Sequence, residues 1–255
     1  MFESIILGIV QGLTEFIPVS STAHLILFPW FFNWGEQFNT LTFDVALHAG
    51  TLLALILCFW KDWLNLITKN HKMLGFIILA TLPAGIAGFL LNDLVEESLR
   101  SPYIISISLV VIGIFMLISE KMVHNRKTDE IKLSDVILIG ISQAFALIPG
   151  VSRSGITIST GIFLGIERSD SAKFSFLLST PIIAGAVLLH TKKIITGNIA
   201  YDPQIFLIGF TASAITGFIA IKFLLSFFKK HPMNIFAYYR FILAAVIIVG
   251  LWLKG

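Results

Sequence analysis

The sequence has few charged residues for its length. Only 13% of its 255 residues are charged, against about 25% in an ordinary soluble domain, and the mean hydropathy is +0.89. This shortage excludes a water-soluble globule and a disordered chain, which needs high charge and low hydrophobicity. The net charge of +3 is spread over short segments, which excludes a nucleic-acid partner. Hydrophobic residues make up 56% of the chain, which indicates an all-α polytopic membrane protein.

Cysteine and the features of a signal peptide are also scarce. The one cysteine, Cys58, lies in an apolar run and has no second thiol to pair with, so it does not indicate a redox compartment. The chain starts with MFESIILGIVQG, in which an acidic residue replaces the usual basic region and no small-residue cleavage site follows. We therefore expect the first apolar segment to remain in the mature protein.

Eight apolar segments are present, and two of them are broken. Six have the length of about 20 residues that a membrane-spanning helix needs: 43–60, 74–92, 102–119, 172–190, 204–228 and 234–253. The segments 2–32 and 134–166 carry Pro18 and Pro149 near their middles, each followed by Ser-rich sequence. We predict two re-entrant helix–loop–helix hairpins there, because irregular backbone at membrane depth must be buried or face a cavity. A proline kink in an ordinary span is the alternative.

Loop charges orient the predicted spans. Eleven Lys and Arg residues lie in 61–73, 120–133, 167–173 and 229–233, whereas the alternate loops contain only Arg100, Lys192 and Lys193. Because positive loops face the cytoplasm, we expect both termini outside.

The two broken segments resemble each other in sequence. Leu7–His24 aligns with Leu138–Gly155 at an offset of 131 residues, which places Pro18 on Pro149 and Ser21 on Ser152. Halves of about 1–120 and 134–253 would each contain one hairpin and three spans. Three is odd, so the halves form an inverted-topology repeat within a single membrane domain, 1–255, a plan common in transporters. Chance similarity between apolar sequences is the alternative.

Five charged residues remain at predicted membrane depth, where charges are costly and commonly functional: Glu15, Asp44, Arg153, Lys222 and Arg240. We expect Lys222 and Arg240 to extend toward the cytoplasmic ends of their spans. Asp44, at the start of a span, is either a helix cap or a functional group. Glu15 and Arg153 lie beside the two central prolines.

The residues at the breaks suit phosphoryl transfer. The first break offers an acid, hydroxyls and an imidazole, and the second offers an arginine between serines and glycines: Gln11, Glu15, Pro18, Ser20, Ser21, Thr22 and His24, with Pro149, Gly150, Ser152, Arg153, Ser154 and Gly155. Free N–H groups at a restarting helix and a guanidinium bind phosphate. Glu15 or His24 can serve as base for a serine nucleophile, and Glu15 also suits a divalent cation. The alternative is structural, with hydroxyls bonded to helix carbonyls and Arg153 paired to Glu15.

At QGLTEFIPVSSTAH and PGVSRSG the sequence closely resembles the bacterial undecaprenyl-diphosphate phosphatase family, of the bacitracin-resistance type, over essentially the whole chain. The resemblance implies a membrane phosphatase that converts undecaprenyl diphosphate to the monophosphate, recycles the carrier lipid for peptidoglycan synthesis and confers bacitracin resistance. It also implies a site at the outer face of the cytoplasmic membrane, a divalent cation such as Mg²⁺ or Ca²⁺, and an interlocked inverted repeat.

The family's residue roles carry over by position. Ser21 matches the proposed nucleophile, Glu15 and His24 the acidic and imidazole positions, and Arg153 the phosphate-binding arginine. His24 is the alternative nucleophile. Ser20, Thr22, Ser152, Ser154 and Gly155 match the surrounding phosphate-binding shell, and Gln11, Pro18, Pro149 and Gly150 support it. Gln11 stands where many members have Glu, so Glu15 is the expected metal ligand.

The expected partners are a prenyl diphosphate lipid, membrane lipids and a second copy of the chain as a homodimer. A transporter or flippase of the same lipid is the alternative function, because inverted repeats with broken helices also build transporters. Membrane phosphatases with paired Lys–Arg–Pro and Pro–Ser–Gly–His motifs are excluded, since both motifs are absent.

Overall fold

The computed structural model describes residues 1–35, 38, 40–97, 99, 101–197 and 202–254, with the side chains of 41, 92–97, 195 and 254 left out. Its regular elements in these ranges are helices, and no strand occurs there. In chain order they are α1 Phe2–Phe16, α2 Ser21–Phe32, α3 Leu41–Thr68, α4 His71–Glu97, α5 Pro102–Ser119, η2 Thr128–Glu130, α6 Leu133–Ala144, η3 Phe145–Leu147, α7 Arg153–Phe163, α8 Arg168–Thr196, α9 Pro203–Phe227 and α10 Asn234–Lys254. Arg100, one of the three basic residues in the alternate loops, lies outside the described residues.

Six of the described helices are long and apolar enough to cross a membrane, which confirms the six predicted spans. They are Thr42–Thr68, His71–Leu91, Pro102–Ser119, Arg168–Ile194, Pro203–Phe227 and Asn234–Leu253. Large apolar side chains are exposed on these helices, for example Phe89, Ile107 and Trp252. An exposed apolar surface of this kind suits contact with lipid rather than water. The chain is therefore a multi-pass helical membrane protein.

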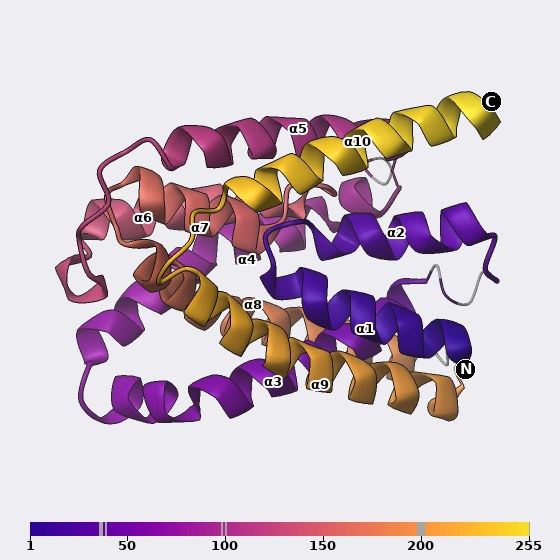
Figure 1. Cartoon of the computed structure of the whole chain (residues 1–255). Coiled ribbons are helices and arrows are strands. Elements are labelled where there is room, and N and C mark those ends of the chain that lie inside the picture. Colours follow the sequence, from indigo (N-terminus) through magenta and orange to yellow (C-terminus); the bar gives the residue numbers. More distant parts are fainter. Residues whose placement is uncertain (36–37, 39, 98, 100, 198–201, 255) are drawn as a thin grey trace.

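The helices run roughly along one direction, and the N and C marks in Figure 1 lie at the same end of the bundle. The figure shows α1 and α2 side by side, joined by a turn near the middle of the molecule's length. Helix α9 packs against both α1 and α3, α10 against α5, α6 against α4, and α7 against α8. The broken segments thus pack against the long helices.

Small residues bring α1 close to α9. A methyl group added at Gly12 would lie 2.0 Å from Thr216 Oγ1 and 2.6 Å from the Ser213 carbonyl oxygen. Backbones that approach this closely gain van der Waals contact, which is the main source of helix association where lipid surrounds the protein. The contact fixes α1, and with it the end of α1 that carries Glu15.

Both breaks have the same local construction. Helix α1 ends at Phe16 before Pro18, and η3 ends at Leu147 before Pro149. The next helix in each case starts after a serine with positive φ, Ser20 at 77° and Ser152 at 71°. Proline cannot continue a helix, and a serine N-cap begins the next one by accepting a backbone hydrogen bond.

The second turn is one residue longer than the first, because Gly150 is inserted at φ 95°, a conformation that glycine adopts without strain. The two cap serines therefore correspond as Ser20 with Ser152. The sequence alignment pairs Ser21 with Ser152 instead, one residue away.

The expectation for Arg240 is wrong. Its side chain is completely buried, and its guanidinium donates to backbone carbonyls instead of reaching an aqueous end of the span. Lys222, in contrast, is exposed and places its ammonium 4.2 Å from the ring centroid of Phe218.

Candidate active site

A cavity lies where the two breaks meet. One wall is polar and comes mainly from the breaks, and the other is apolar and comes from α4, η3 and α8. The polar lining consists of Glu15, Ser20, Ser21, Thr22, His48, Gln143, Ser152 and Arg153, and the apolar lining of Ala84, Ala146, Leu147, Ile148, Ile182, Ile183 and Ala186. Such a cavity suits an amphipathic ligand. Its charged and hydroxyl groups can bind a polar head group, and its apolar side chains can contact a hydrocarbon chain attached to that head group.

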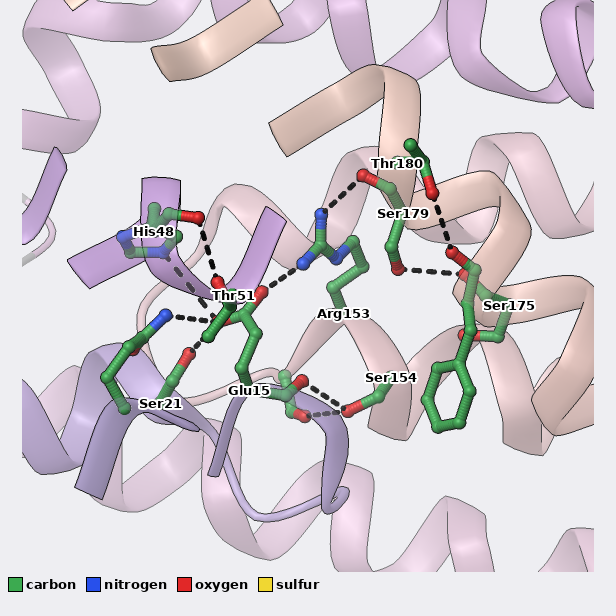
Figure 2. Close-up of polar contacts among 12 residues, drawn as sticks. Glu15, Ser21, His48, Thr51, Arg153, Ser154, Ser175, Ser179 and Thr180 are labelled. Carbon is green, nitrogen blue, oxygen red and sulfur yellow. Dashed lines mark hydrogen bonds and ion pairs between the residues drawn. The ribbon is translucent and has the colours of Figure 1, made fainter. Parts of the chain in front are cut away.

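Glu15 lies at the centre of the polar contacts. Its Oε2 accepts hydrogen bonds from Ser21 Oγ at 2.7 Å and Gln11 Nε2 at 2.9 Å, while Oε1 pairs with Arg153 Nη2. Figure 2 shows Glu15, Ser21 and Arg153 converging from two segments far apart in the sequence. A buried carboxylate is tolerated when it is paired and hydrogen-bonded, as this one is. The contact joins the two breaks directly.

Arg153 faces the cavity as the first residue of α7. Besides Glu15 it donates from Nη1 to the Ser179 carbonyl oxygen at 3.4 Å, and its buried Nε has no hydrogen-bond partner within the described part of the chain. A guanidinium has five N–H donors in a planar fork. Arg153 can therefore pair with Glu15 and still donate hydrogen bonds to a phosphate.

The two cap serines, Ser20 and Ser152, line the cavity at the N-termini of α2 and α7. Ser20 Oγ accepts from the Ala23 N–H at 3.4 Å, and Ser152 Oγ accepts from the Gly155 N–H at 3.1 Å. Each cap satisfies one of the free N–H groups in the first turn of α2 or α7, and the others remain available. Two helix N-termini beside a guanidinium form a good environment for an anion.

The supporting residues surround the cavity without lining it. Ser154 Oγ donates to the Glu15 carbonyl oxygen at 3.2 Å and lies 3.2 Å from Ser152 Oγ. Gln11 contacts Glu15 from one helical turn away. The other predicted supporting residues shape the backbone. Pro18, Pro149 and Gly150 lie in the turns, and Gly155 lies in the first turn of α7.

His24 does not line the cavity. It is buried, with Nδ1 2.7 Å from the Ser20 carbonyl oxygen and Nε2 2.7 Å from the Tyr239 hydroxyl. Its predicted catalytic role stays a prediction, and its contacts link α2 to α10.

His48 is a cavity residue that the sequence analysis missed. It lies on α3, with Nε2 3.7 Å from Glu15 Oε2 and Nδ1 2.7 Å from the Asp44 carbonyl oxygen. Because a carbonyl only accepts, the Nδ1 atom carries a hydrogen, and Nε2 is the ring nitrogen that faces the Glu15 carboxylate. The signal for it in the sequence is an ionisable side chain within the predicted span 43–60, which a count of Asp, Glu, Lys and Arg alone does not include.

The fit of a divalent cation rests on a few oxygen atoms. Gln11 Oε1 is buried without a hydrogen-bond partner in the described residues, next to the Glu15 carboxylate. No group of three or more His, Cys, Asp or Glu suited to a metal occurs in the described residues. Mg²⁺ commonly has one or two carboxylate ligands and takes the rest from phosphate and water, so the residues present fit such an ion.

These features define a class: a helical membrane protein with a partly buried serine, carboxylate and arginine site beside apolar side chains. Residues 4–246 match the family described as bacitracin resistance protein BacA. The chain belongs to this family.

Curated relatives are similar over nearly their whole length. The chain is 56% identical over 247 residues to the undecaprenyl-diphosphatase of Thermodesulfovibrio yellowstonii, covering 97% of this chain and 96% of the relative. It is 48% identical to the undecaprenyl-diphosphatase of Caldicellulosiruptor bescii, covering 100% and 98%, and 44% identical to that of Desulforudis audaxviator, covering 100% and 99%.

Proposed function

We propose that this protein hydrolyses undecaprenyl diphosphate to undecaprenyl phosphate and inorganic phosphate, which recycles the cell-wall carrier lipid and confers bacitracin resistance. The family and the names of the relatives support this function. The observation that carries it is the contact of Ser21 Oγ with Glu15, whose other oxygen pairs with Arg153. A hydroxyl bonded to a carboxylate beside a guanidinium is a nucleophile, a base and a phosphate ligand in one place.

In the proposed first step, Ser21 Oγ attacks the terminal phosphorus of the diphosphate and its proton passes to Glu15 Oε2, 2.7 Å away. An O–P bond forms as the bridging P–O bond breaks, and undecaprenyl phosphate leaves with the bonding electrons. Arg153 and the N–H groups at the starts of α2 and α7 stabilise the charge on the equatorial oxygens.

In the second step, water attacks the phosphoserine and the bond between phosphorus and Ser21 Oγ breaks. Glu15 returns its proton to the Ser21 oxygen, and the proton of the water is lost to bulk solvent. The products are inorganic phosphate and the original serine, so the site is restored.

A divalent cation, Mg²⁺ or Ca²⁺, belongs to this proposal. Glu15 and Gln11 Oε1 would hold it, and it would neutralise phosphate charge. The ion is expected to depend on phosphate oxygens for its remaining ligands, because the protein provides few.

The hairpins α1–α2 and α6–α7 are proposed to be re-entrant. Helix α1 has 15 residues and α6 has 12, which at 1.5 Å per residue falls well short of the roughly 30 Å of hydrocarbon in a bilayer. With three spans after each hairpin, the halves 1–120 and 134–253 form the inverted repeat. We place the protein in the bacterial cytoplasmic membrane, with its site open to the outer face and both termini outside.

The Ser21–Glu15 hydrogen bond favours hydrolysis over the alternative of a lipid transporter or flippase. A transporter requires the anion-binding groups but has no use for a hydroxyl held against a base. Lipid movement across liposome membranes by a Ser21→Ala protein that releases no phosphate would reverse this preference.

The test is phosphate release from undecaprenyl diphosphate by the purified protein, with and without a chelator. We expect release by the wild type, a loss with the chelator, and a decrease of about 10³-fold or more for Ser21→Ala, since the nucleophile is gone. Ser106→Ala is the matched control, because Ser106 Oγ donates only to the Pro102 carbonyl of its own helix. No release by the wild type, or an unchanged rate for Ser21→Ala, would refute the mechanism.

A further inference from the structure

Arg240 is a buried cation that the proposed mechanism does not use. It is the largest of the fully buried side chains, with 0% of its surface exposed. Among the described residues no carboxylate pairs with it; all of its hydrogen bonds go to backbone carbonyl oxygens. An arginine within a membrane span is costly and needs a compensating role.

The five carbonyl groups come from three segments. Nε donates to Leu109 at 3.1 Å and Nη2 to Ser108 at 3.3 Å, both within α5. Nη1 donates to Pro18 at 3.3 Å, in the first break. Nη2 also donates to Gly150 at 2.6 Å and Val151 at 3.1 Å, in the second break. One guanidinium therefore holds both breaks to one helix.

The electrostatics of this position are favourable without a carboxylate. The Pro18 carbonyl follows the C-terminal end of α1, and the Gly150 and Val151 carbonyls follow the end of η3. Carbonyl groups at helix C-termini carry partial negative charge and stabilise a cation. They belong to the turns between helices, and Arg240 donates to each of them.

The held carbonyls lie close to the reacting groups. Ser21 is three residues after Pro18, and Arg153 is three residues after Gly150. A cap serine with positive φ lies between in each case, and its hydroxyl accepts from the first turn of the helix that carries the reacting group. Moving either turn relative to Arg240 would change the distance between Ser21 and Arg153.

We propose that Arg240 is a positioning residue: by binding the carbonyls of both breaks at once, it sets Ser21 against Arg153 in the geometry that phosphoryl transfer requires. This inference rests on the proposed function. Lysine does not replace it, because one ammonium has three donors at a single point, whereas the planar guanidinium reaches three segments.

The experiment compares Arg240→Lys and Arg240→Met with the wild type in the purified full chain. Thermal unfolding in detergent gives the folded fraction, and phosphate release from undecaprenyl diphosphate gives kcat and KM per folded molecule. We expect kcat of Arg240→Lys to fall about 100-fold with KM within about threefold, because a displacement near 1 Å can cost that factor. Lys222→Met is the control, since it removes a cation over Phe218 on α9 and should leave kcat unchanged.

A second arm separates positioning from general damage. In a Ser21→Ala background, Arg240→Lys should change the residual rate by less than about threefold, because residues acting through one another are not additive. The inference fails if Arg240→Lys keeps wild-type kcat, if it lowers both backgrounds equally, or if neither Arg240 variant folds. Absence of phosphate release by the wild type would instead count against the proposed function.

Discussion

His24 and Tyr239 form a stacked pair, with ring centroids 5.8 Å apart, an interplanar angle of 11° and a 2.7 Å contact between His24 Nε2 and the tyrosine hydroxyl. The other ring nitrogen contacts the Ser20 carbonyl oxygen. Both nitrogens are thus used within the protein, and the pair joins the start of α2 to α10. We infer that this histidine holds Ser20, and with it the adjacent Ser21, in place.

This inference predicts that removal of the Tyr239 hydroxyl lowers stability more than activity. Tyr239→Phe leaves His24 Nε2 buried without its hydroxyl, a loss of about 1–3 kcal/mol in the free energy of unfolding. We expect a lower melting temperature in detergent and phosphate release within about tenfold of wild type, since no reacting group is removed. Loss of activity by several orders of magnitude for Tyr239→Phe, with stability unchanged, would instead give His24 a direct part in the chemistry.

Arg153 and Arg168 are two arginines paired to glutamates in different settings. Arg153 contacts Glu15 in the cavity, and Arg168 binds both carboxylate oxygens of Glu120 at 2.6–3.0 Å, away from it. We expect Arg153→Lys to lower kcat/KM about 100-fold, because an ammonium lacks the fork that binds carboxylate and phosphate together.

Arg168→Lys is the control for that substitution. It should reduce stability while leaving kcat/KM per folded molecule near wild type. Equal losses of kcat/KM in the two variants would mean that the Arg153 effect reports folding rather than phosphate binding. Steady-state kinetics with thermal unfolding of both proteins distinguish the cases.

Hydropathy predicted the six spans because burial in lipid demands apolar side chains along a whole helix. It predicted 102–119 and 234–253 correctly but underestimated the first span: α3 continues to Thr68 beyond Lys61 and Asp62, where the predicted span ends at 60. Charged residues end the hydrocarbon-crossing segment but not the helix, and here Asp62 Oδ1 pairs with Lys173 Nζ at 2.6 Å. Hydropathy indicates whether a helix is surrounded by lipid or water, but it does not indicate the residue at which the helix ends.

The site was predictable in part for the same reason. Glu15 and Arg153 were identified because charges beside broken helices are rare, and the structure brings them into contact. The prediction that Arg240 extends toward an aqueous end of its span was wrong because its acceptors are carbonyls of distant turns. Every residue has a backbone carbonyl, so a sequence does not show which of them will bind an arginine. Its position depends on how the hairpins meet, which only the folded chain provides.

His48 provides a further prediction at the cavity. Its Nε2 lies 3.7 Å from Glu15 Oε2 and its side chain lines the cavity from α3. We expect His48→Ala to reduce kcat/KM about tenfold, because a hydrogen-bonding group beside the carboxylate and phosphate is lost. His124→Ala is the control, since His124 is only partly buried and its Nδ1 bonds the Met122 carbonyl oxygen two residues away. Indistinguishable rates for His48→Ala and wild type would assign His48 to the wall of the cavity alone.

Gly12 tests whether the close contact of α1 with α9 holds the catalytic end of α1. A methyl group there would meet Thr216 Oγ1 at 2.0 Å and backbone atoms of Ser213 and Gly217 at 2.6 and 2.7 Å, so α1 must move. We expect Gly12→Ala to destabilise the protein by about 1–3 kcal/mol, as overpacking does. Phosphate release should also fall, because Glu15 is less than one turn further along α1.

Gly85→Ala is the matched control, since it too lies within a long helix, and nothing lies within 4 Å of an added methyl group. Alanine is the better helix former, so this variant should be as stable as the wild type or slightly more so. If Gly12→Ala melts like Gly85→Ala, the α1–α9 contact is looser than the structure has it. If it melts lower but releases phosphate at the wild-type rate per folded molecule, α9 stabilises α1 without setting the position of Glu15, and that task falls to the contacts of Glu15 with the second break.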